Sequence, residues 1–202
     1  FRKVHGATGA YADEVPFVEA TVWLRIIDAC LPKQTTKVTN WFHCDCLATW
    51  YKADAFSEEH WQVIENYVSV AVKHGINMLL TPMFTPPLDT AVGGERPTMQ
   101  LIDVTVTGKD EYTFGFDKLK RWIDMALRCG IKQFELSHLF TQWGARHAPK
   151  IVDVNGKLLF GWKTPASGKK YKTFLTQFAK ALDEFLANES VKDRCWIHVS
   201  DE

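Results

Sequence analysis

The 202-residue sequence has no excess of charge of either sign, because 24 lysine and arginine residues balance 24 aspartate and glutamate residues. This balance argues against a nucleic-acid-binding protein that relies on a basic surface. No apolar run approaches the roughly 20 residues that a membrane-spanning helix needs, so we expect no membrane span. With 46% hydrophobic and 24% charged residues, the composition is typical of a globular protein rather than a disordered chain.

Cysteine is sparse and has no recognisable pattern. Five irregularly spaced cysteines do not form a disulfide framework, and a chain of this length does not need one. Cys44 and Cys46 lack the two-residue gap of a typical metal-binding pair, and no second pair follows. We therefore expect free thiols, which favour a reducing compartment such as the cytoplasm, and we expect no cofactor.

The two ends of the sequence indicate a piece of a longer protein. The chain begins with Phe1 rather than methionine, and it stops at Glu202 directly after a strongly apolar segment. Residues 17–27 are rich in β-branched and aromatic side chains, which predicts one or two strands. We expect residues 1–37 to be the end of a preceding β-domain plus a linker, and residues 38–202 to be part of a second domain.

From residue 38 onward, segments that favour strands alternate with segments that favour helices. The predicted strands are 41–47, 76–80, 131–137 and 195–200, and the predicted helices are 57–74, 117–129 and 169–187. Each helix has its apolar residues along one face, and the first two end at Gly75 and Gly130. This order predicts parallel strands joined by right-handed crossovers.

The predicted loops differ in length at the two ends of the strands. Helix-to-strand loops are short, whereas residues 81–117 and 137–167 are long and contain two expected hairpins, turning at 107–110 and 155–156. A (β/α)8 barrel has this layout, with its active site at the carboxyl ends of the strands. A doubly wound open sheet shows the same alternation, but no glycine-rich phosphate-binding motif follows any predicted strand. We therefore expect the first half of a (β/α)8 barrel, strands 1 to 4.

Ionisable residues lie at the carboxyl ends of three predicted strands. They are His43 and Asp45 on the first strand, Glu135 and His138 on the third, and His198, Asp201 and Glu202 on the fourth. Unpaired charges are costly to bury, so this pattern indicates a site. Each of His43, Glu135 and His198 can also be a hydrogen-bonded core residue, and Arg96 or His138 could be the partner of Glu135.

The adjacent carboxylates Asp201 and Glu202 suit one kind of glycosidase. Ordinary retaining glycosidases place two carboxylates from different strands roughly 5.5 Å apart. If the 2-acetamido group of an N-acetylhexosamine is the nucleophile, one carboxylate orients that group and its neighbour protonates the leaving oxygen. Trp143 and Trp162 lie in the long loops, where an indole could stack on a sugar.

Five motifs carry a resemblance to a known family. They are Trp-Phe-His-Cys-Asp at 41–45, Thr-Pro-Met-Phe-Thr-Pro-Pro-Leu-Asp-Thr at 81–90, Gly-Gly-Glu-Arg at 93–96, Phe-Glu-Leu-Ser-His-Leu-Phe-Thr-Gln-Trp-Gly-Ala at 134–145 and His-Val-Ser-Asp-Glu at 198–202. Together they resemble the catalytic domain of glycoside hydrolase family 123. The resemblance implies a barrel behind a β-sandwich and a β-N-acetylgalactosaminidase that works by substrate-assisted retention.

The resemblance also implies roles for single residues. Asp201 stabilises the acetamido group, and Glu202 is the general acid/base. The residues that we assign to substrate binding are His43, Asp45, Arg96, Glu135, His138, Trp143 and Trp162. The expected partner is an N-acetylhexosamine-containing glycan, with no nucleic acid, no metal and no prediction of oligomeric state.

Two other functions are compatible with the sequence. A metal-dependent hydrolase would use His43, Asp45, Glu135 and His138 as ligands, although no HxH or HExxH motif is present. A non-catalytic carbohydrate-binding protein would keep the loop tryptophans without needing the carboxylates. Because half a barrel leaves sheet edges uncovered, we expect this stretch of chain to be inactive by itself.

Overall fold

The computed structural model describes residues 20–30, 35–88, 90–142 and 144–199, in two compact units that comprise residues 1–34 and 35–202. The described part of the first unit, residues 20–30, is exposed and contains neither helix nor strand. The strand expected over 17–27 is therefore wrong for residues 20–27, and residues 17–19 lie outside the described part. A strand needs a neighbour to accept and donate its backbone hydrogen bonds, and no strand in the described part of the chain pairs with these residues.

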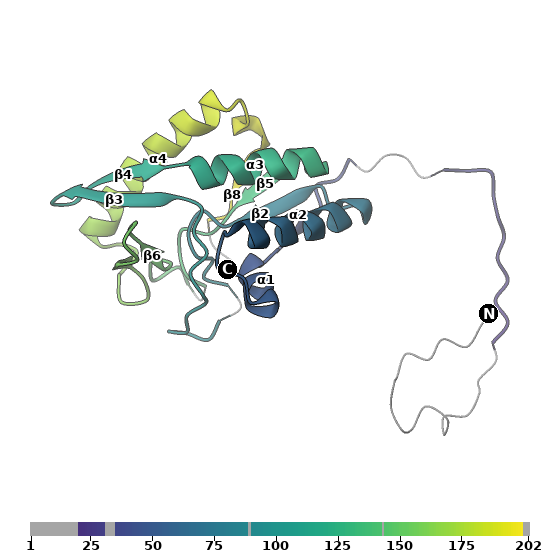
Figure 1. Ribbon diagram of the computed structural model, residues 1–202, viewed down its shortest axis with the longest axis horizontal. Helices are drawn as coiled ribbons and strands as arrows, with labels where there is room; N and C mark the ends of the chain where they lie inside the picture. Colours follow the sequence, from purple (N-terminus) through teal and green to yellow (C-terminus); the bar gives the residue numbers. More distant parts are fainter. Residues whose placement is uncertain (1–19, 31–34, 89, 143, 200–202) are drawn as a thin grey trace, which may run out of the picture. The chain divides into compact units, whose positions relative to one another are not determined.

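The second unit is built on a four-stranded parallel sheet (Figure 1). Its order is β1 (Thr39–Asn40), β2 (Met78–Thr81), β5 (Gln133–Leu136) and β8 (Cys195–Ile197). All three neighbouring pairs are parallel, so the predicted parallel alternation is confirmed. Because the order in the sheet equals the order along the chain, each strand is added beside the previous one after a helical crossover.

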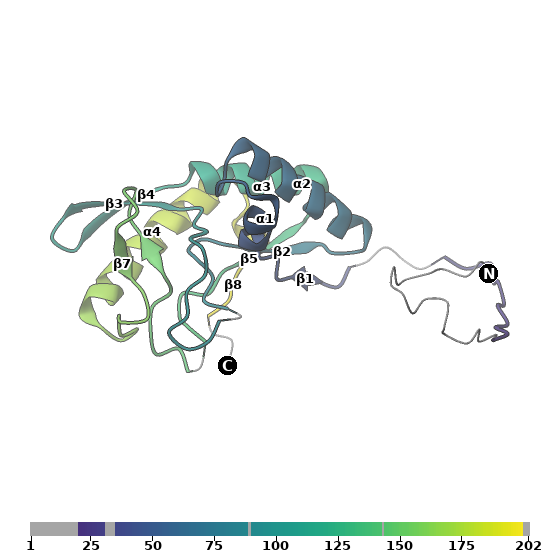
Figure 2. The same ribbon diagram turned by 60° about the horizontal axis from the view of Figure 1, so that its bottom comes forward.

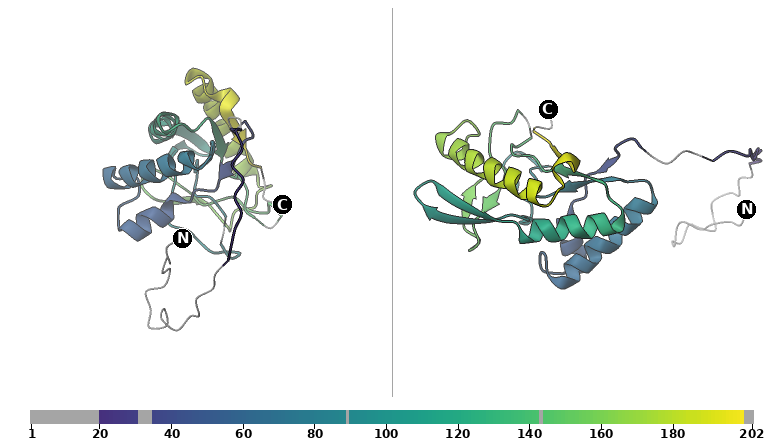
Figure 3. Two further views of the ribbon diagram at one scale, coloured as in Figure 1. Left: turned by 90° about the vertical axis from the view of Figure 1, so that its right-hand side faces the viewer. Right: turned by 90° about the horizontal axis from the view of Figure 1, so that it is seen from above.

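Three long helices lie along one face of this sheet (Figures 1 and 3). They are α2 (Glu58–Lys73), α3 (Asp117–Cys129) and α4 (Lys169–Asn188), all within one residue of the predicted bounds. Ser57 caps α2 by accepting a hydrogen bond from the His60 amide. Their apolar faces bury Trp122 and Phe174 completely. Among the described residues, no helix combines the length and apolarity that crossing a bilayer requires.

The first predicted strand is misplaced. Residues 41–47 were expected to be a strand, but β1 covers only Thr39–Asn40, and helix α1 runs over Cys44–Tyr51. Within α1 the buried residues include Cys44, Leu47 and Ala48, whose i, i+3, i+4 spacing is that of a helix face. His43 and Asp45 therefore do not share a strand face. His43 precedes the helix, and Asp45 lies in its first turn, where a carboxylate is favourable.

The long loops fold into the two expected hairpins (Figure 2). One pairs β3 (Asp103–Gly108) with β4 (Glu111–Gly115), and the other pairs β6 (Ile151–Val152) with β7 (Leu158–Phe160). The Val154 amide donates to the Val104 carbonyl over 3.0 Å, so the hairpins are in contact. A 3₁₀ turn, Lys192–Arg194, then leads into β8.

The two glycines that join a helix to the next strand provide a matched test of this packing. Gly75 and Gly130 both have a positive φ, of 91° and 106°. A Cβ added at Gly130 would lie 3.1 Å from Val72 Cγ1, whereas a Cβ added at Gly75 would have no atom within 4 Å. We expect Gly75→Ala to cost about 1–2 kcal/mol and Gly130→Ala roughly 1 kcal/mol more, because only the latter must also displace Val72. Urea unfolding measures both, and equal losses would contradict the crowding at Gly130.

Candidate active site at the carboxyl ends of the strands

One buried carboxylate connects three strands of the sheet. Glu135 on β5 is 8% exposed in its side chain. Its Oε2 accepts a hydrogen bond from Thr39 Oγ1 over 2.5 Å, and its Oε1 accepts from Trp41 Nε1 over 3.1 Å and from His198 Nδ1 over 2.6 Å. Thr39 lies on β1, Trp41 follows β1 and His198 follows β8, so both outer strands are tied to the same side chain.

These contacts lower the pKa of Glu135 and orient the ring of His198. Burial raises the pKa of the Glu135 carboxyl, but the hydrogen bonds from Thr39, His198 and Trp41 outweigh burial, and the pKa lies below its ordinary value. An ionised carboxylate can only accept hydrogen bonds, so Nδ1 of His198 must carry a proton. The other ring nitrogen, Nε2, is then an acceptor in the neutral ring or a second donor in the charged ring.

An aromatic group surrounds this carboxylate. The rings of His138 and His198 lie 3.8 Å apart between centroids, at an interplanar angle of 35°. Trp41 meets both edge-on, at 5.8 Å from His138 and 5.9 Å from His198. His138 thus belongs to the same group as Glu135 through the rings of Trp41 and His198. The partner of Glu135 is His198, whereas Arg96 pairs elsewhere.

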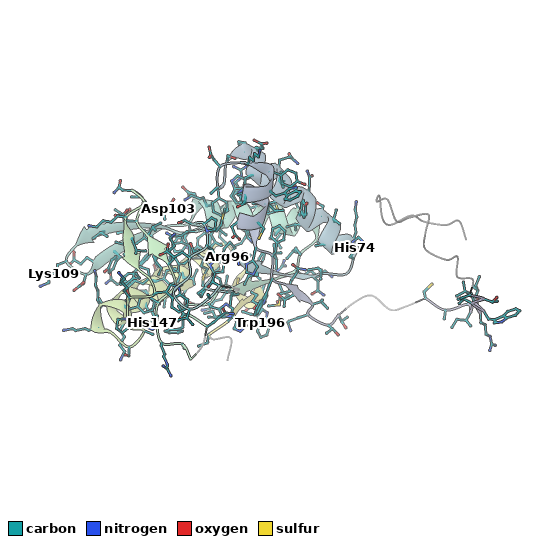
Figure 4. The ribbon with its side chains drawn as sticks, turned by 90° about the horizontal axis from the view of Figure 1, so that it is seen from below. His74, Arg96, Asp103, Lys109, His147 and Trp196 are labelled. Carbon is teal, nitrogen blue, oxygen red and sulfur yellow. The ribbon has the colours of Figure 1, made fainter. Side chains whose placement is uncertain are left out.

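A second buried ion pair joins helix α1 to the loop after β2. Arg96 binds Asp45 through two bonds, Nε to Oδ2 over 3.1 Å and Nη2 to Oδ1 over 2.9 Å. The two side chains are only 12% and 10% exposed. Arg96 Nη1 also donates to the Leu88 carbonyl over 3.2 Å, which closes the loop around the guanidinium. Figure 4 shows Arg96 in the middle of this unit, between Lys109 on the β3–β4 hairpin and His74 after α2.

Trp162 and Arg96 line the same hollow. The indole Nε1 of Trp162 donates to the Gly94 carbonyl over 2.7 Å, which fixes the tryptophan against the Gly-Gly-Glu-Arg segment. The hollow is also lined by Thr85, Thr141 and Lys150, and an adjoining one of about 400 Å³ shares Glu95 and Trp162. An indole beside hydroxyl, ammonium and carboxylate groups offers both a stacking surface and hydrogen-bonding partners for a polar ligand.

The structure places His43 just before α1. The predicted site residues Trp143, Asp201 and Glu202 lie outside the described residues. The expected metal ligands do not form one set, because Asp45 binds Arg96 while Glu135 binds other donors. Within the described ranges, no three His, Cys, Asp or Glu residues are grouped so that they could hold a metal ion.

Sequence reasoning assigns no site role to two members of the cluster. Trp41 enters it as part of a predicted strand and of the 41–45 motif, and His198 enters it as a strand-end residue that can also be a core histidine. Trp41 belongs to the 41–45 motif and His198 to the 198–202 motif, and both motifs also hold candidate site residues. That position beside candidate residues was the available signal, but the hydrogen bonds to Glu135 depend on folding.

A comparison with known families now bears on this arrangement. The model of the glycoside hydrolase 123 catalytic domain matches residues 41–202. The chain belongs to this family. The predicted family is therefore confirmed, although no curated protein matches the sequence.

A solved structure also resembles this chain in its fold. One that matches is a family 123 glycoside hydrolase from Clostridium perfringens, whose study concerns glycolipid glycan hydrolysis. It has a TM-score of 0.58 and 16% sequence identity to this chain. The match covers 78% of this chain and 28% of that enzyme. This chain therefore spans less than a third of the length of that enzyme. At this identity the likeness concerns the fold.

The Asp45–Arg96 pair is expected to stabilise the fold far more than an exposed pair of the same geometry. Asp45→Ala removes a carboxylate that is bound through two bonds to a buried guanidinium, and we expect a loss of about 3 kcal/mol. Adding Arg96→Ala removes the guanidinium that Asp45 binds, so the double variant loses less than the sum of the single losses. The measurement is a urea-unfolding double-mutant cycle.

The control is the Arg121–Glu58 pair between α3 and α2. It is also two-pronged, at 2.6 and 2.7 Å, but both side chains are well exposed. Its coupling should be much smaller than that of Asp45 and Arg96, because solvent screens it. Equal coupling in the two cycles would contradict the importance of burial.

The lowered pKa of Glu135 predicts a pH-dependent contribution to stability. Because the folded-state pKa is below the ordinary value of 4.5, the ionised group stabilises the fold above that pH, and the contribution disappears as the pH falls through the folded-state pKa. The stability difference between wild type and Glu135→Gln should thus be largest near neutral pH and shrink in acid. Urea unfolding over this range tests it, with the exposed Glu184→Gln as control. A difference that does not vary with pH would refute the prediction.

Proposed function

We propose that the protein containing this chain is a glycoside hydrolase that removes terminal β-linked N-acetylgalactosamine. The observation that carries the proposal is the family match, which extends through Asp201 and Glu202. The polar cluster at the carboxyl ends of β1, β5 and β8 supports it, because enzymes built on parallel strands place their chemistry at those ends. The reaction we propose needs no metal or cofactor.

The proposed mechanism retains the configuration of the sugar through two displacements. Asp201 holds the acetamido N–H, so the acetamido carbonyl oxygen attacks C1 while the bond from C1 to the leaving oxygen breaks. Glu202 gives its proton to that oxygen. Glu202 then takes a proton from water as the water oxygen bonds to C1, and the bond between C1 and the acetamido oxygen breaks. Two inversions at C1 restore the original configuration, and Glu202 is again protonated.

The fold that we propose for residues 38–202 is the first half of a (β/α)8 barrel, preceded over residues 1–37 by the end of a β-sandwich and a linker. The Thr39–Glu135 hydrogen bond supports the barrel. β2 lies between β1 and β5, and in a flat sheet those two strands would be about 10 Å apart. Side chains that converge across an intervening strand indicate a curved sheet, and in barrels alternate strands fill the same interior layer.

The remaining site residues are proposed to form the substrate side of this half-barrel. They are His43, Asp45, Arg96, His138, Trp143 and Trp162. Glu135 lies among them, but its two oxygens are bound by Thr39, Trp41 and His198. Among them, Trp162 offers a ring fixed by its bond to Gly94, on which a sugar could stack. The Asp45–Arg96 pair holds the loop that carries Gly94, so it supports the stacking surface from behind.

Two aryl glycosides separate this mechanism from direct attack by a carboxylate. The whole protein should cleave an aryl β-N-acetylgalactosaminide, whereas the matched aryl β-galactoside, which lacks the acetamido nucleophile, should react at least about 10²-fold more slowly. Glu202→Gln should lose about 10²–10⁴-fold with a poor leaving group, because that oxygen needs its proton. With a leaving group as acidic as dinitrophenol, most of that loss should disappear.

The controls use the same substrates and the same protein. Equal cleavage of the galactoside would contradict the substrate-assisted step. A loss below tenfold for Glu202→Gln with the poor leaving group would contradict the acid/base role of Glu202. Glycan binding without turnover, unchanged in the Asp201→Ala, Glu202→Ala double variant, would instead indicate a carbohydrate-binding protein.

A further inference from the structure

We propose that Glu135 is a positioning residue, which acts through His198 on the segment that leads into Asp201 and Glu202. The proposal rests on the function proposed above. Glu135 is assigned here to the protein rather than to the sugar, and its task is to hold the end of β8 in register with β5.

The first argument is the way His198 is attached. Its backbone amide donates to the Leu136 carbonyl over 3.2 Å, which continues the β5–β8 ladder one residue beyond Ile197. Its side chain is bound to Glu135 over 2.6 Å, and its ring packs against His138. Main chain and side chain of one residue are thus both held by β5 and the residues that follow it, three positions before Asp201.

The second argument is that the carboxylate is already occupied by protein donors. Oε1 accepts from Trp41 and His198, and Oε2 accepts from Thr39. A carboxylate has about four lone-pair sites, so three of them are used within the fold. The Glu135 carboxylate therefore positions Thr39, Trp41 and His198.

The pattern of these bonds makes glutamine an informative replacement. The glutamine oxygen can accept from Trp41 and His198 where Oε1 does now, and its NH₂ can donate to the Thr39 hydroxyl, which accepts as readily as it donates. Glu135→Gln therefore keeps every contact and removes only the charge, whereas Glu135→Ala removes all three. Comparing Glu135→Gln with Glu135→Ala therefore separates the effect of the carboxylate charge from the effect of the hydrogen bonds that position His198.

His198 offers a similar pair. Asparagine places an N–H near the position of Nδ1 and keeps the contact with Glu135, whereas glutamine places its polar end near the position of Nε2. If position is what matters, asparagine preserves activity better than glutamine. If Nε2 contacts the substrate, the order is reversed.

A matched control lies on the same strand pair. Trp196 Nε1 donates to Gln133 Oε1 over 2.8 Å, a side-chain tie between β8 and β5 two residues earlier on each strand. Because alternate residues of a strand share a face, this tie lies on the same face as Glu135–His198, but farther from Asp201. Gln133→Ala removes it while leaving the end of β8 tied.

The experiment measures kcat and KM of the whole protein on the aryl β-N-acetylgalactosaminide. Since misplacement by about 1 Å can cost 10²-fold, we expect Glu135→Ala to lose about 10²-fold in kcat with KM within about threefold. Glu135→Gln, His198→Asn and Gln133→Ala should stay within about fivefold of wild type. His198→Gln should lose at least tenfold.

Each contrary pattern overturns the proposal. Loss in Glu135→Gln equal to that in Glu135→Ala would mean that the charge acts on the reaction. Activity in His198→Gln that exceeds His198→Asn would mean that Nε2 is the working atom. A kcat loss in Gln133→Ala as large as in Glu135→Ala would mean that any weakening of the strand pair suffices.

A second readout separates this proposal from the proposed function. If wild type cleaves no N-acetylgalactosaminide, the function fails, and hydrogen–deuterium exchange of the peptide covering residues 198–202 then decides the positioning. Glu135→Ala should exchange at least about tenfold faster there than wild type, Glu135→Gln and Gln133→Ala, since it alone loses the ties around His198. Equal exchange in all four proteins would overturn the proposal.

Discussion

The site depends on the hydrogen bonds that converge on one ionised carboxylate, Glu135. A buried charge is stable only when donors replace the water it has lost, and here the donors are Thr39, Trp41 and His198. Because they come from both outer strands, satisfying the charge also brings β1 and β8 toward β5. The electrostatic requirement of a single side chain is therefore a structural constraint on three of the four strands of the sheet.

The Asp45–Arg96 pair applies the same principle to a loop. The segment after β2 buries apolar side chains such as Met83, Phe84 and Leu88, and polar contacts fix its remaining part. Arg96 binds Asp45 on α1 and the Leu88 carbonyl within the loop, and Trp162 is anchored to the Gly94 carbonyl beside it. In both groups the buried charged side chains are hydrogen-bonded within the fold. The contacts of Glu135 thus hold the ends of the strands, and the Asp45–Arg96 pair holds the loop after β2.

The sequence predicted the parts of this fold whose signals are local. Helix α2 has a capping serine before it and Gly75 after it, and the hairpin turn at Gly156 lies between short apolar segments. Residues 41–47 failed because Cys44, Leu47 and Ala48 satisfy a helical spacing within a stretch that also alternates. The partner of Glu135 could not be predicted, because His198 is 63 residues away and only the register of β5 and β8 brings the two together.

The two faces of the sheet explain why chemistry and core are separated. On β5 the alternate residues Phe134 and Leu136 belong to the hydrophobic core with Leu79 of β2, whereas Gln133 and Glu135 point to the opposite face. Met78 and Leu80 are paired with Gln133 and Glu135, so they share this second face and lie outside that core cluster. Leu80 and Glu135 are both buried on this second face, so a charge there requires donors from the neighbouring strands. The alternation of polar and apolar residues along β5 therefore already separates a face for packing from a face for chemistry, and the polar face is the one on which Thr39 and His198 meet Glu135.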